Sequence, residues 1–205
     1  MMCKFRNAGQ TCVCANRIYV QAGVHDAFAA KLKVAVDALQ VGDGFGDGIT
    51  TGPLISNNAM AKVQDHLDDI LANGGTVLTG GAAHELGASF FQPTIVTGVT
   101  KDMKVAQEET FGPLAPLFKF DDVDDVIAQA NDTIFGLAAY FYASDLSRVY
   151  KVAEELEYGI VGVNTGIIST EVAPFGGIKQ SGLGREGSHH GIEEFMEMKY
   201  VCMSV

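Results

Sequence analysis

Short apolar segments alternate with amphipathic segments along the 205-residue chain, and this alternation constrains the fold more than any other feature. The apolar segments are rich in β-branched and aromatic residues and nearly continuous, as expected for strands covered on both faces. They are RIYV (17–20), TVLT (76–79), TIVTGV (94–99), APLFKF (115–120), LAAYFY (137–142) and IVGVN (160–164). Such strands alternating with helices predict an α/β fold, a three-layer domain in which helices flank a largely parallel sheet.

The amphipathic segments carry apolar residues at helical spacing. The expected helices span residues 25–39, 57–73, 122–131 and 145–157. In the second of them Met60, Val63, Leu67 and Ile70 form one stripe, and Gly74 follows as a stop signal. The final segment, MKYVCMSV, predicts an edge strand suited to pairing with another chain.

Composition excludes several classes of protein. Hydrophobic residues make up 47% and charged residues 19% of the chain, which is typical of a globular protein. The net charge of −11, without a basic run, argues against nucleic-acid binding. No apolar run is long enough to span a bilayer, no signal peptide opens the sequence, and four cysteines do not resemble a secreted disulfide framework. We therefore expect a cytoplasmic protein with reduced thiols that acts on neither nucleic acid nor membranes.

The stretch FRNAGQTCVCANR (5–17) carries the candidate chemistry. Gly9 and Gln10 make a tight, polar approach to Cys12, Arg6 adds positive charge nearby, and an expected strand follows. A thiolate needs an electropositive, partly open surrounding of this kind to be populated at neutral pH. The alternative is a cysteine that serves only as a small buried apolar residue.

Cys14 lies two residues after Cys12, and this spacing limits what the pair can do. A zinc site would need further cysteines, or histidines at ligand spacing, whereas His189 and His190 are consecutive and stand alone. We therefore expect no metal site. A disulfide between residues two apart is strained and easily reduced, which suits a reversible redox lock better than a permanent crosslink.

An acidic segment before one of the expected strands has two possible interpretations. EETFGP (108–113) is either a solvated helix end before a strand or a rigid turn whose carboxylate accepts hydrogen bonds from a sugar diol, and spacing alone leaves both open.

SGLGREG (181–187) formally matches the glycine pattern of dinucleotide-binding folds. That pattern must follow a buried strand and open a helix within a βαβ unit. The preceding APFGGIKQ is not a buried strand, and too few residues follow for a crossover and a second strand, so we interpret the segment as a glycine-rich turn.

Four of these segments occur in the same order in the aldehyde dehydrogenase superfamily: FRNAGQTC, EETFGPLAP, PFGGIKQSGLGREG and the terminal KYVC. The chain resembles this family from Lys4 to Cys202, and the finer pattern is most similar to its succinate-semialdehyde dehydrogenase branch, with glutarate-semialdehyde enzymes as close neighbours. The resemblance implies that residues 1–190 form the nucleophile-bearing catalytic domain and that 191–205 form a helix turn and an oligomerisation strand. It also implies that the dinucleotide-binding domain lies outside this chain.

In this family the cysteine that closes GQTC is the nucleophile, so the resemblance assigns that role to Cys12. Its thiolate would attack an aldehyde carbon to give a thiohemiacetal, hydride would pass to NAD or NADP, and water would hydrolyse the resulting thioester to the acid. The backbone N–H of Cys12 would help to hold the oxyanion. Cys14 would be its redox partner.

The resemblance also assigns binding roles. Glu109 is similar to the carboxylate that binds the nicotinamide-side ribose, and Phe111 to the aromatic beside it. Phe175 is similar to an aromatic that lines the aldehyde tunnel. Arg6 and Ser169 resemble the residues that hold the distal carboxylate of the substrate, and a fork-shaped guanidinium suits a carboxylate.

The expected function is therefore part of a homo-oligomeric (dimeric or tetrameric) NAD(P)-dependent succinate-semialdehyde dehydrogenase. The general base and the oxyanion asparagine of the family precede the nucleophile, so we expect the isolated chain to have negligible turnover. Glutarate semialdehyde as substrate and a non-enzymatic oligomerisation or binding module are the alternatives. A papain-like hydrolase would need a different sequence around the cysteine. The choice between NAD and NADP stays open.

Overall fold

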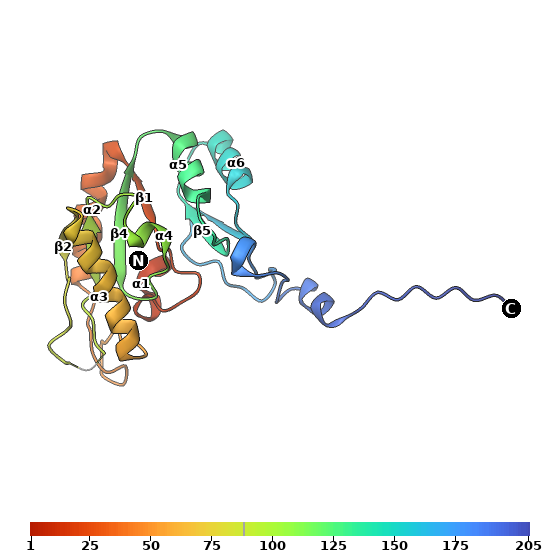
Figure 1. Ribbon diagram of the computed structural model, residues 1–205, viewed down its shortest axis with the longest axis horizontal. Coiled ribbons are helices and arrows are strands. Elements are labelled where there is room, and N and C mark those ends of the chain that lie inside the picture. The colour runs from red at the N-terminus through yellow and green to blue at the C-terminus, as the bar shows by residue number, and fades with distance from the viewer. Residues whose placement is uncertain (88) are drawn as a thin grey trace. The chain divides into compact units, whose positions relative to one another are not determined.

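The computed structural model describes residues 1–87 and 89–205 as two compact units, residues 1–133 and 134–205. The first unit contains, in chain order, α1 (Met2–Phe5), β1 (Ile18–Gln21), α2 (His25–Asp37), α3 (Asn57–Ala72), β2 (Thr76–Thr79), β3 (Thr94–Thr97), α4 (Lys104–Gln107), β4 (Leu114–Phe120) and α5 (Val123–Asn131) (Figure 1). The second contains β5 (Ala138–Phe141), α6 (Leu146–Glu155) and β6 (Ile160–Val163). Short 3-10 turns span Arg6–Gly9, Ala22–Val24, Lys179–Ser181 and His190–Phe195.

The first unit is built on a four-stranded sheet with the order β1-β4-β3-β2. β4 pairs in parallel with both β1 and β3, and β2 is an antiparallel edge strand beside β3. Each of the six predicted strands is present, and the four predicted helices end within two residues of their expected bounds. The prediction of an α/β fold with a largely parallel sheet is confirmed.

Two apolar clusters cover the two faces of this sheet. Alternate residues of a strand point to opposite faces, so Leu114 and Phe118 belong to one cluster while Ala115 and Leu117 belong to the other. The first cluster contains the α3 stripe, with Val63, Leu67 and Ile70, and the second contains Ala29 and Val36 of α2. Each large side chain buried in this way contributes roughly 1.5–3 kcal/mol. The sheet therefore lies between α2 and α3, which is the predicted three-layer arrangement.

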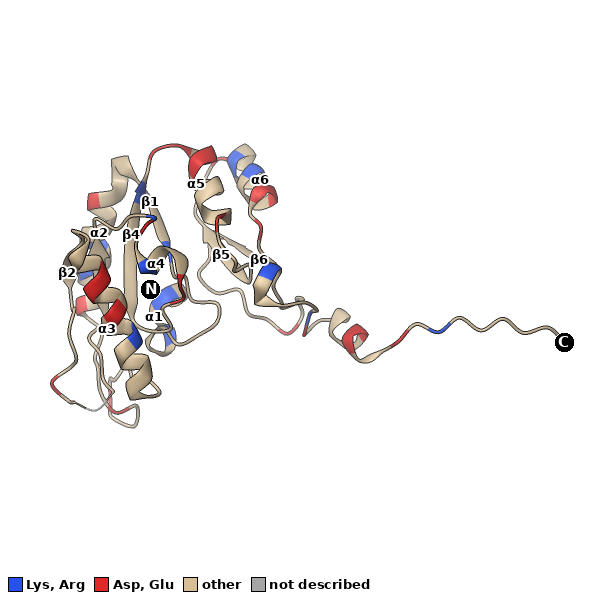
Figure 2. Ribbon diagram, in the orientation of Figure 1, with Lys and Arg blue, Asp and Glu red and all other residues tan. Residues whose placement is uncertain are grey.

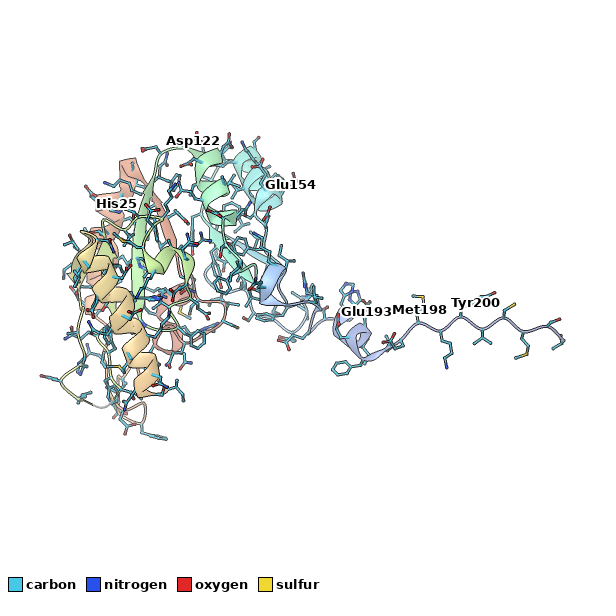
Figure 3. The ribbon with its side chains drawn as sticks, viewed as in Figure 1. His25, Asp122, Glu154, Glu193, Met198 and Tyr200 are labelled. Carbon is cyan, nitrogen blue, oxygen red and sulfur yellow. The ribbon has the colours of Figure 1, made fainter. Side chains whose placement is uncertain are left out.

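The second unit contains the parallel pair β5 and β6 and the helix α6. α6 begins after Asp145, whose Oδ1 accepts a 2.8 Å hydrogen bond from the Arg148 backbone N–H. Residues 196–205 form an extended tail, in which Met198 and Tyr200 project into solvent (Figure 3). Within the described residues this tail has no partner strand, and the predicted oligomerisation strand stays a prediction.

Acidic residues are distributed over several elements, including α3, α5 and α6 (Figure 2). Among the described residues, no helix is both long and apolar enough to cross a membrane.

Candidate active site

The loop that carries Cys12, here called the thiol loop (residues 6–16), begins with an unusual backbone. Asn7, Ala8 and Gly9 have consecutive positive φ angles of 52°, 54° and 76°. Asparagine tolerates this region, and Asn7 Nδ2 donates a 2.9 Å hydrogen bond to the Gln10 carbonyl. A non-glycine residue in this conformation costs about 1–3 kcal/mol, and it persists where the surroundings determine the backbone. The loop is therefore a rigid, strained element, as nucleophile-bearing loops often are.

Side chains on either side of the cysteines anchor this loop. Gln10 Nε2 donates to the Pro53 carbonyl at 3.2 Å, and Gln10 Oε1 accepts from the Ile55 N–H at 2.8 Å. Downstream, Arg17 donates to the carbonyls of Gln129 and Ala130 at the end of α5, each at 2.8 Å. The polar residue expected before Cys12, Gln10, thus makes two hydrogen bonds to a segment about forty residues away in the sequence.

The two cysteines of the loop differ in accessibility. A turn in which the Cys14 N–H donates to the Thr11 carbonyl at 2.8 Å leaves Cys12 exposed and Cys14 only 8% exposed. The Cys12 N–H forms no hydrogen bond with the described residues, so it can face a developing oxyanion. Burial raises the pKa of Cys14, opposed most strongly by the Lys4 charge. Both thiols are free. Accessibility therefore favours Cys12 as the nucleophile.

The EETFGP turn, here called the Glu109 turn (residues 108–113), lies directly against the thiol loop. A methyl group on Gly9 would overlap the carbonyl oxygen of Gly112, so the two backbones touch at a place where only glycine fits. Asn16 Oδ1 accepts a 2.7 Å hydrogen bond from the Thr110 N–H. Two motifs that are about a hundred residues apart in the sequence are thus neighbours in space.

The two glutamates of this turn have different surroundings. Glu108 forms an ion pair with Lys62 and a 3.3 Å contact with His66 Nε2, and these partners lower its pKa. Glu109 is exposed, and its carboxylate makes no hydrogen bond or ion pair with the described residues. Phe111 beside it is 41% exposed. Glu109 thus has a carboxylate without a partner among the described residues, next to the accessible ring of Phe111, as the ribose-binding pair implied by the resemblance would need. Of the two glutamates, only Glu109 fits this role.

His66, a buried histidine that the sequence analysis did not identify, contacts the Glu109 turn through Thr110 and Glu108. His66 on α3 is fully buried, and its Nδ1 lies 2.6 Å from Thr110 Oγ1. Burial lowers the pKa of His66, opposed by its hydrogen bond to Glu108. The available signal was a polar residue inside the apolar stripe of the predicted helix, between Val63 and Leu67.

Lys4 is a second residue that sequence reasoning did not identify. It is 2% exposed, and its Nζ forms no hydrogen bond with the described residues. Burial lowers the pKa of Lys4 to about 8, opposed by interactions with Cys14, Glu109 and Cys3. The charges that act on Lys4 thus come from the thiol loop, from Glu109 and from its own helix. Nothing in a four-residue helix at the start of the sequence signals such burial.

The remaining predicted site residues divide between the two units. Arg6 belongs to the thiol loop, and its half-buried guanidinium makes no hydrogen bond or ion pair with the described residues while its charge acts on Cys14. Ser169 and Phe175 belong to the second unit. Ser169 is exposed on the segment after β6, and Phe175 exchanges two 2.8 Å backbone hydrogen bonds with Glu186. The first unit thus brings together Arg6, Cys12 and Cys14 with the Glu109 turn.

The glycine-rich segments of the second unit are packing turns, as interpreted from the sequence. Gly159 touches the backbone of Gly176, where a methyl group would not fit. Arg185 Nη1 donates to the carbonyls of Gly177 and Gly184 at 2.8 and 2.7 Å, so the two halves of PFGGIKQSGLGREG hold each other. Across residues 1–87 and 89–205, no group of three or more His, Cys, Asp or Glu side chains is placed to hold a metal ion.

Comparison with known proteins identifies the family. Residues 1–201 match the model of the aldehyde dehydrogenase family. The chain is 67% identical over 202 residues to the NADP-dependent succinate-semialdehyde dehydrogenase GabD of Escherichia coli K12, covering 98% of this chain and 42% of that protein. It is 61% identical over 203 residues to a glutarate-semialdehyde dehydrogenase of Pseudomonas aeruginosa, covering 99% of this chain and 42% of that protein.

The fold comparison agrees. The crystal structure of a succinate-semialdehyde dehydrogenase from Burkholderia pseudomallei superposes with a TM-score of 0.97 at 59% identity, covering 98% of this chain and 42% of that one. The chain therefore spans about two fifths of the length of these relatives. The chain belongs to the aldehyde dehydrogenase family.

Proposed function

We propose that this chain supplies the nucleophile-bearing part of an NAD(P)-dependent dehydrogenase that oxidises succinate semialdehyde to succinate. The observation that carries the proposal is the exposed Cys12, with an unengaged backbone N–H, on a rigid loop fixed against the Glu109 turn. The most similar relatives named above act on semialdehydes of succinate or glutarate. Glutarate semialdehyde is therefore the alternative substrate.

The thiol loop supplies the reacting groups. Cys12 Sγ, as the thiolate, attacks the aldehyde carbon, and the carbonyl oxygen takes up negative charge beside the Cys12 N–H. Oxidation of the thiohemiacetal leaves an acyl thioester on Cys12, which water hydrolyses to the acid. When bound, NAD(P) supplies the two-electron acceptor, and Glu109 and Phe111 are the residues of this chain that would hold it.

Substrate recognition is proposed to rest on the charge of Arg6. A guanidinium that no described residue engages is suited to a bidentate bond with the distal carboxylate of a short semialdehyde. Ser169 and Phe175 stay proposed substrate-binding residues of the second unit, for the hydroxyl and the aromatic surface that they expose.

The complete enzyme is proposed to be a cytoplasmic homo-oligomer, with the extended tail pairing with another subunit. Sedimentation of the chain with and without residues 196–205 tests the tail, because an unchanged oligomeric state would contradict this role. The chain alone is expected to produce negligible NAD(P)H from succinate semialdehyde. Robust turnover by these 205 residues would contradict that expectation.

Protection of Cys12 by aldehydes tests the proposed substrate class directly. The rate of Cys12 carbamidomethylation by iodoacetamide is measured by peptide mass spectrometry with succinate semialdehyde, glutarate semialdehyde, butanal or succinate present. We expect the semialdehydes to slow alkylation at concentrations at which butanal and succinate do not. Arg6→Met should remove the advantage of the semialdehydes over butanal, whereas Arg148→Met on the exposed face of α6 should not.

The outcomes separate an enzyme site from a binding module. Equal protection by butanal and the semialdehydes in the unmodified chain would contradict the role of Arg6. Equal protection by succinate would indicate that the loop binds carboxylates without covalent chemistry at Cys12.

A further inference from the structure

The side chain of Lys4 has no role in the proposed reaction, yet its position is the least expected in the first unit. Its Nζ is buried and makes no hydrogen bond with any described residue. An ammonium group removed from water is strongly disfavoured unless a negative charge or hydrogen-bond acceptors compensate. A nearby group that becomes negatively charged would supply the missing compensation.

Cys14 is the buried group placed to do so. The backbone next to Cys14 is bonded to the backbone next to Lys4, because the Ala15 N–H donates to the Cys3 carbonyl at 2.7 Å. Cys14 Sγ lies 3.9 Å from the Arg6 carbonyl oxygen, at the end of the short helix that carries Lys4. The segment that carries Cys14 is therefore joined directly to the short helix that carries Lys4, and both side chains are buried.

The other groups that act on this pair are few. Glu109 and Cys3 are the further groups whose charges favour the ammonium form of Lys4. Arg6 and hydrogen bonds from Thr11 also favour the thiolate of Cys14, but less than Lys4 does. Lys4 is thus the main group that opposes the effect of burial on Cys14 ionisation.

We propose that Lys4 is the proton partner of Cys14, and that its buried charge makes Cys14 competent to close a disulfide with oxidised Cys12. The inference rests on the proposed role of Cys12 as the reactive thiol of the loop. Lys4 acts through Cys14, so it is a positioning residue for a redox lock and not a catalytic residue.

The chemistry balances with a hydroperoxide as oxidant. The Cys12 thiolate attacks the terminal peroxide oxygen, the O–O bond breaks, and a sulfenic acid forms as an alkoxide leaves and takes up a proton. The Cys14 thiolate, which the Lys4 charge favours, then attacks Cys12 Sγ, so that the S–S bond forms and the S–O bond breaks. Hydroxide leaves and becomes water. Two thiols are oxidised, and one hydroperoxide is reduced to an alcohol and water.

Lys4 makes the rate of this step depend on pH in a distinctive way. Below about pH 8 Lys4 carries its charge and assists ionisation of Cys14. Above that pH the charge on Lys4 is lost. The rate of disulfide closure in a chain without Lys4 should then approach the rate in the unmodified chain.

Ring closure can be timed with Ellman's reagent, whose disulfide releases a coloured thiolate at each exchange. In a parent chain that carries Cys3→Ala and Cys202→Ala, Cys12 releases the first equivalent and becomes a mixed disulfide. The Cys14 thiolate then attacks Cys12 Sγ and releases the second equivalent in a unimolecular step. The rate of the second phase, measured from pH 6 to pH 10, reports the thiolate fraction of Cys14.

We expect Lys4→Met in this parent to slow the second phase at least about tenfold at pH 7, the effect of one pKa unit on Cys14. The ratio of the second-phase rate in the parent to that in Lys4→Met should shrink above pH 8. The first-phase rate should be the same in both chains, which shows that the variant has folded. The control Lys31→Met, on the exposed side of α2, should leave both phases unchanged. If Lys4→Met does not fold, Lys4→Arg decides, because its permanent charge should keep closure fast at pH 7 and remove the attenuation above pH 8.

Closure by Lys4→Met at the parent rate and with the same pH profile would overturn the inference, and so would a parent that never releases the second equivalent. A first label on Cys14, located by mass spectrometry, would contradict the nucleophile assignment as well. A normal first label at Cys12 without dependence on Lys4 would contradict the inference alone.

Discussion

Gly9 is the residue at which the thiol loop and the Glu109 turn meet. It has a positive φ of 76°, and its α-carbon faces the carbonyl of Gly112 with no room for a methyl group. Both the backbone conformation and the contact therefore require glycine. The close approach of the thiol loop to the Glu109 turn therefore requires glycine at this position.

Gly9→Ala should lower the free energy of unfolding by about 3 kcal/mol, because left-handed strain and overpacking add. Urea unfolding measures this change. Gly23→Ala is the matched control, since a methyl group there meets nothing within 4 Å, and it should change stability by less than about 0.5 kcal/mol. Equal effects of the two substitutions would show that the backbone contact at Gly9 is not required.

The charge on Lys4 should make the chain less stable at neutral pH than at high pH. Its pKa is about 8 in the folded chain against 10.5 ordinarily, so between these values the unfolded chain binds more protons. The free energy of unfolding should therefore rise with pH across that window. Below pH 8 the buried charge of Lys4 lowers the free energy of unfolding by about 3 kcal/mol.

Lys4→Met should remove this cost, and the variant should be more stable than the unmodified chain at pH 7 by up to about 3 kcal/mol. The gain should diminish from pH 8 and vanish near pH 10.5. Urea titrations of both chains at pH 7, 9 and 10 measure it. A gain that does not change with pH would indicate an effect of packing and not of charge.

At the scale of elements, α3 supports the Glu109 turn through His66. The ring is buried, contacts Thr110 Oγ1, and has a lowered pKa because of its burial. The unfolded chain takes up a proton at this histidine near its ordinary pKa of 6.5, whereas the lowered pKa in the folded chain delays that uptake to lower pH. Stability should therefore fall as pH drops below 6.5, by at most about 1.4 kcal/mol per pH unit for this group.

His66→Gln removes the titration and keeps hydrogen-bonding capacity, so its stability should fall less steeply between pH 7 and pH 5. Urea midpoints at pH 7, 6 and 5 measure the slopes. His84→Gln, in the same unit, should retain the slope of the unmodified chain. Parallel slopes for the unmodified chain and His66→Gln would contradict the neutral, buried state of His66.

Elements were predictable where their signals are local. The α3 stripe with its stop at Gly74 fixed one helix, and Ser56 completes it by accepting from the Ala59 N–H at 3.3 Å. Asp145 did the same for α6. In contrast α1 and α4 are four residues each, too short to show a helical period.

The candidate site was predictable only in part. Resemblance to a family pointed to Cys12 and Glu109, and the structure adds physical reasons, exposure for one and an unengaged carboxylate for the other. The place of His66 inside the α3 stripe was a local signal, whereas the burial of Lys4 arises from contacts between segments far apart in sequence, so no local pattern reveals it. The same is true of the contact between Gly9 and Gly112.

At the scale of the whole molecule, four thiols share one chain in different surroundings. Cys12 and Cys202 are both exposed, Cys3 is half-buried, and Cys14 is buried. Accessibility alone would make Cys12 and Cys202 react alike. The proposed function requires Cys12 to react faster, because Cys12 lies on the hydrogen-bonded thiol loop that also carries Arg6, whereas Cys202 lies on the extended tail.

Competitive alkylation of the native chain tests this account most directly. Limiting iodoacetamide at pH 7, followed by peptide mass spectrometry, gives the relative rates of all four cysteines in one sample. We expect Cys12 to be labelled first, at least about tenfold faster than Cys202, and Arg6→Met to narrow the difference between these two rates. Equal labelling of Cys12 and Cys202 would contradict the assignment of Cys12 as the nucleophile.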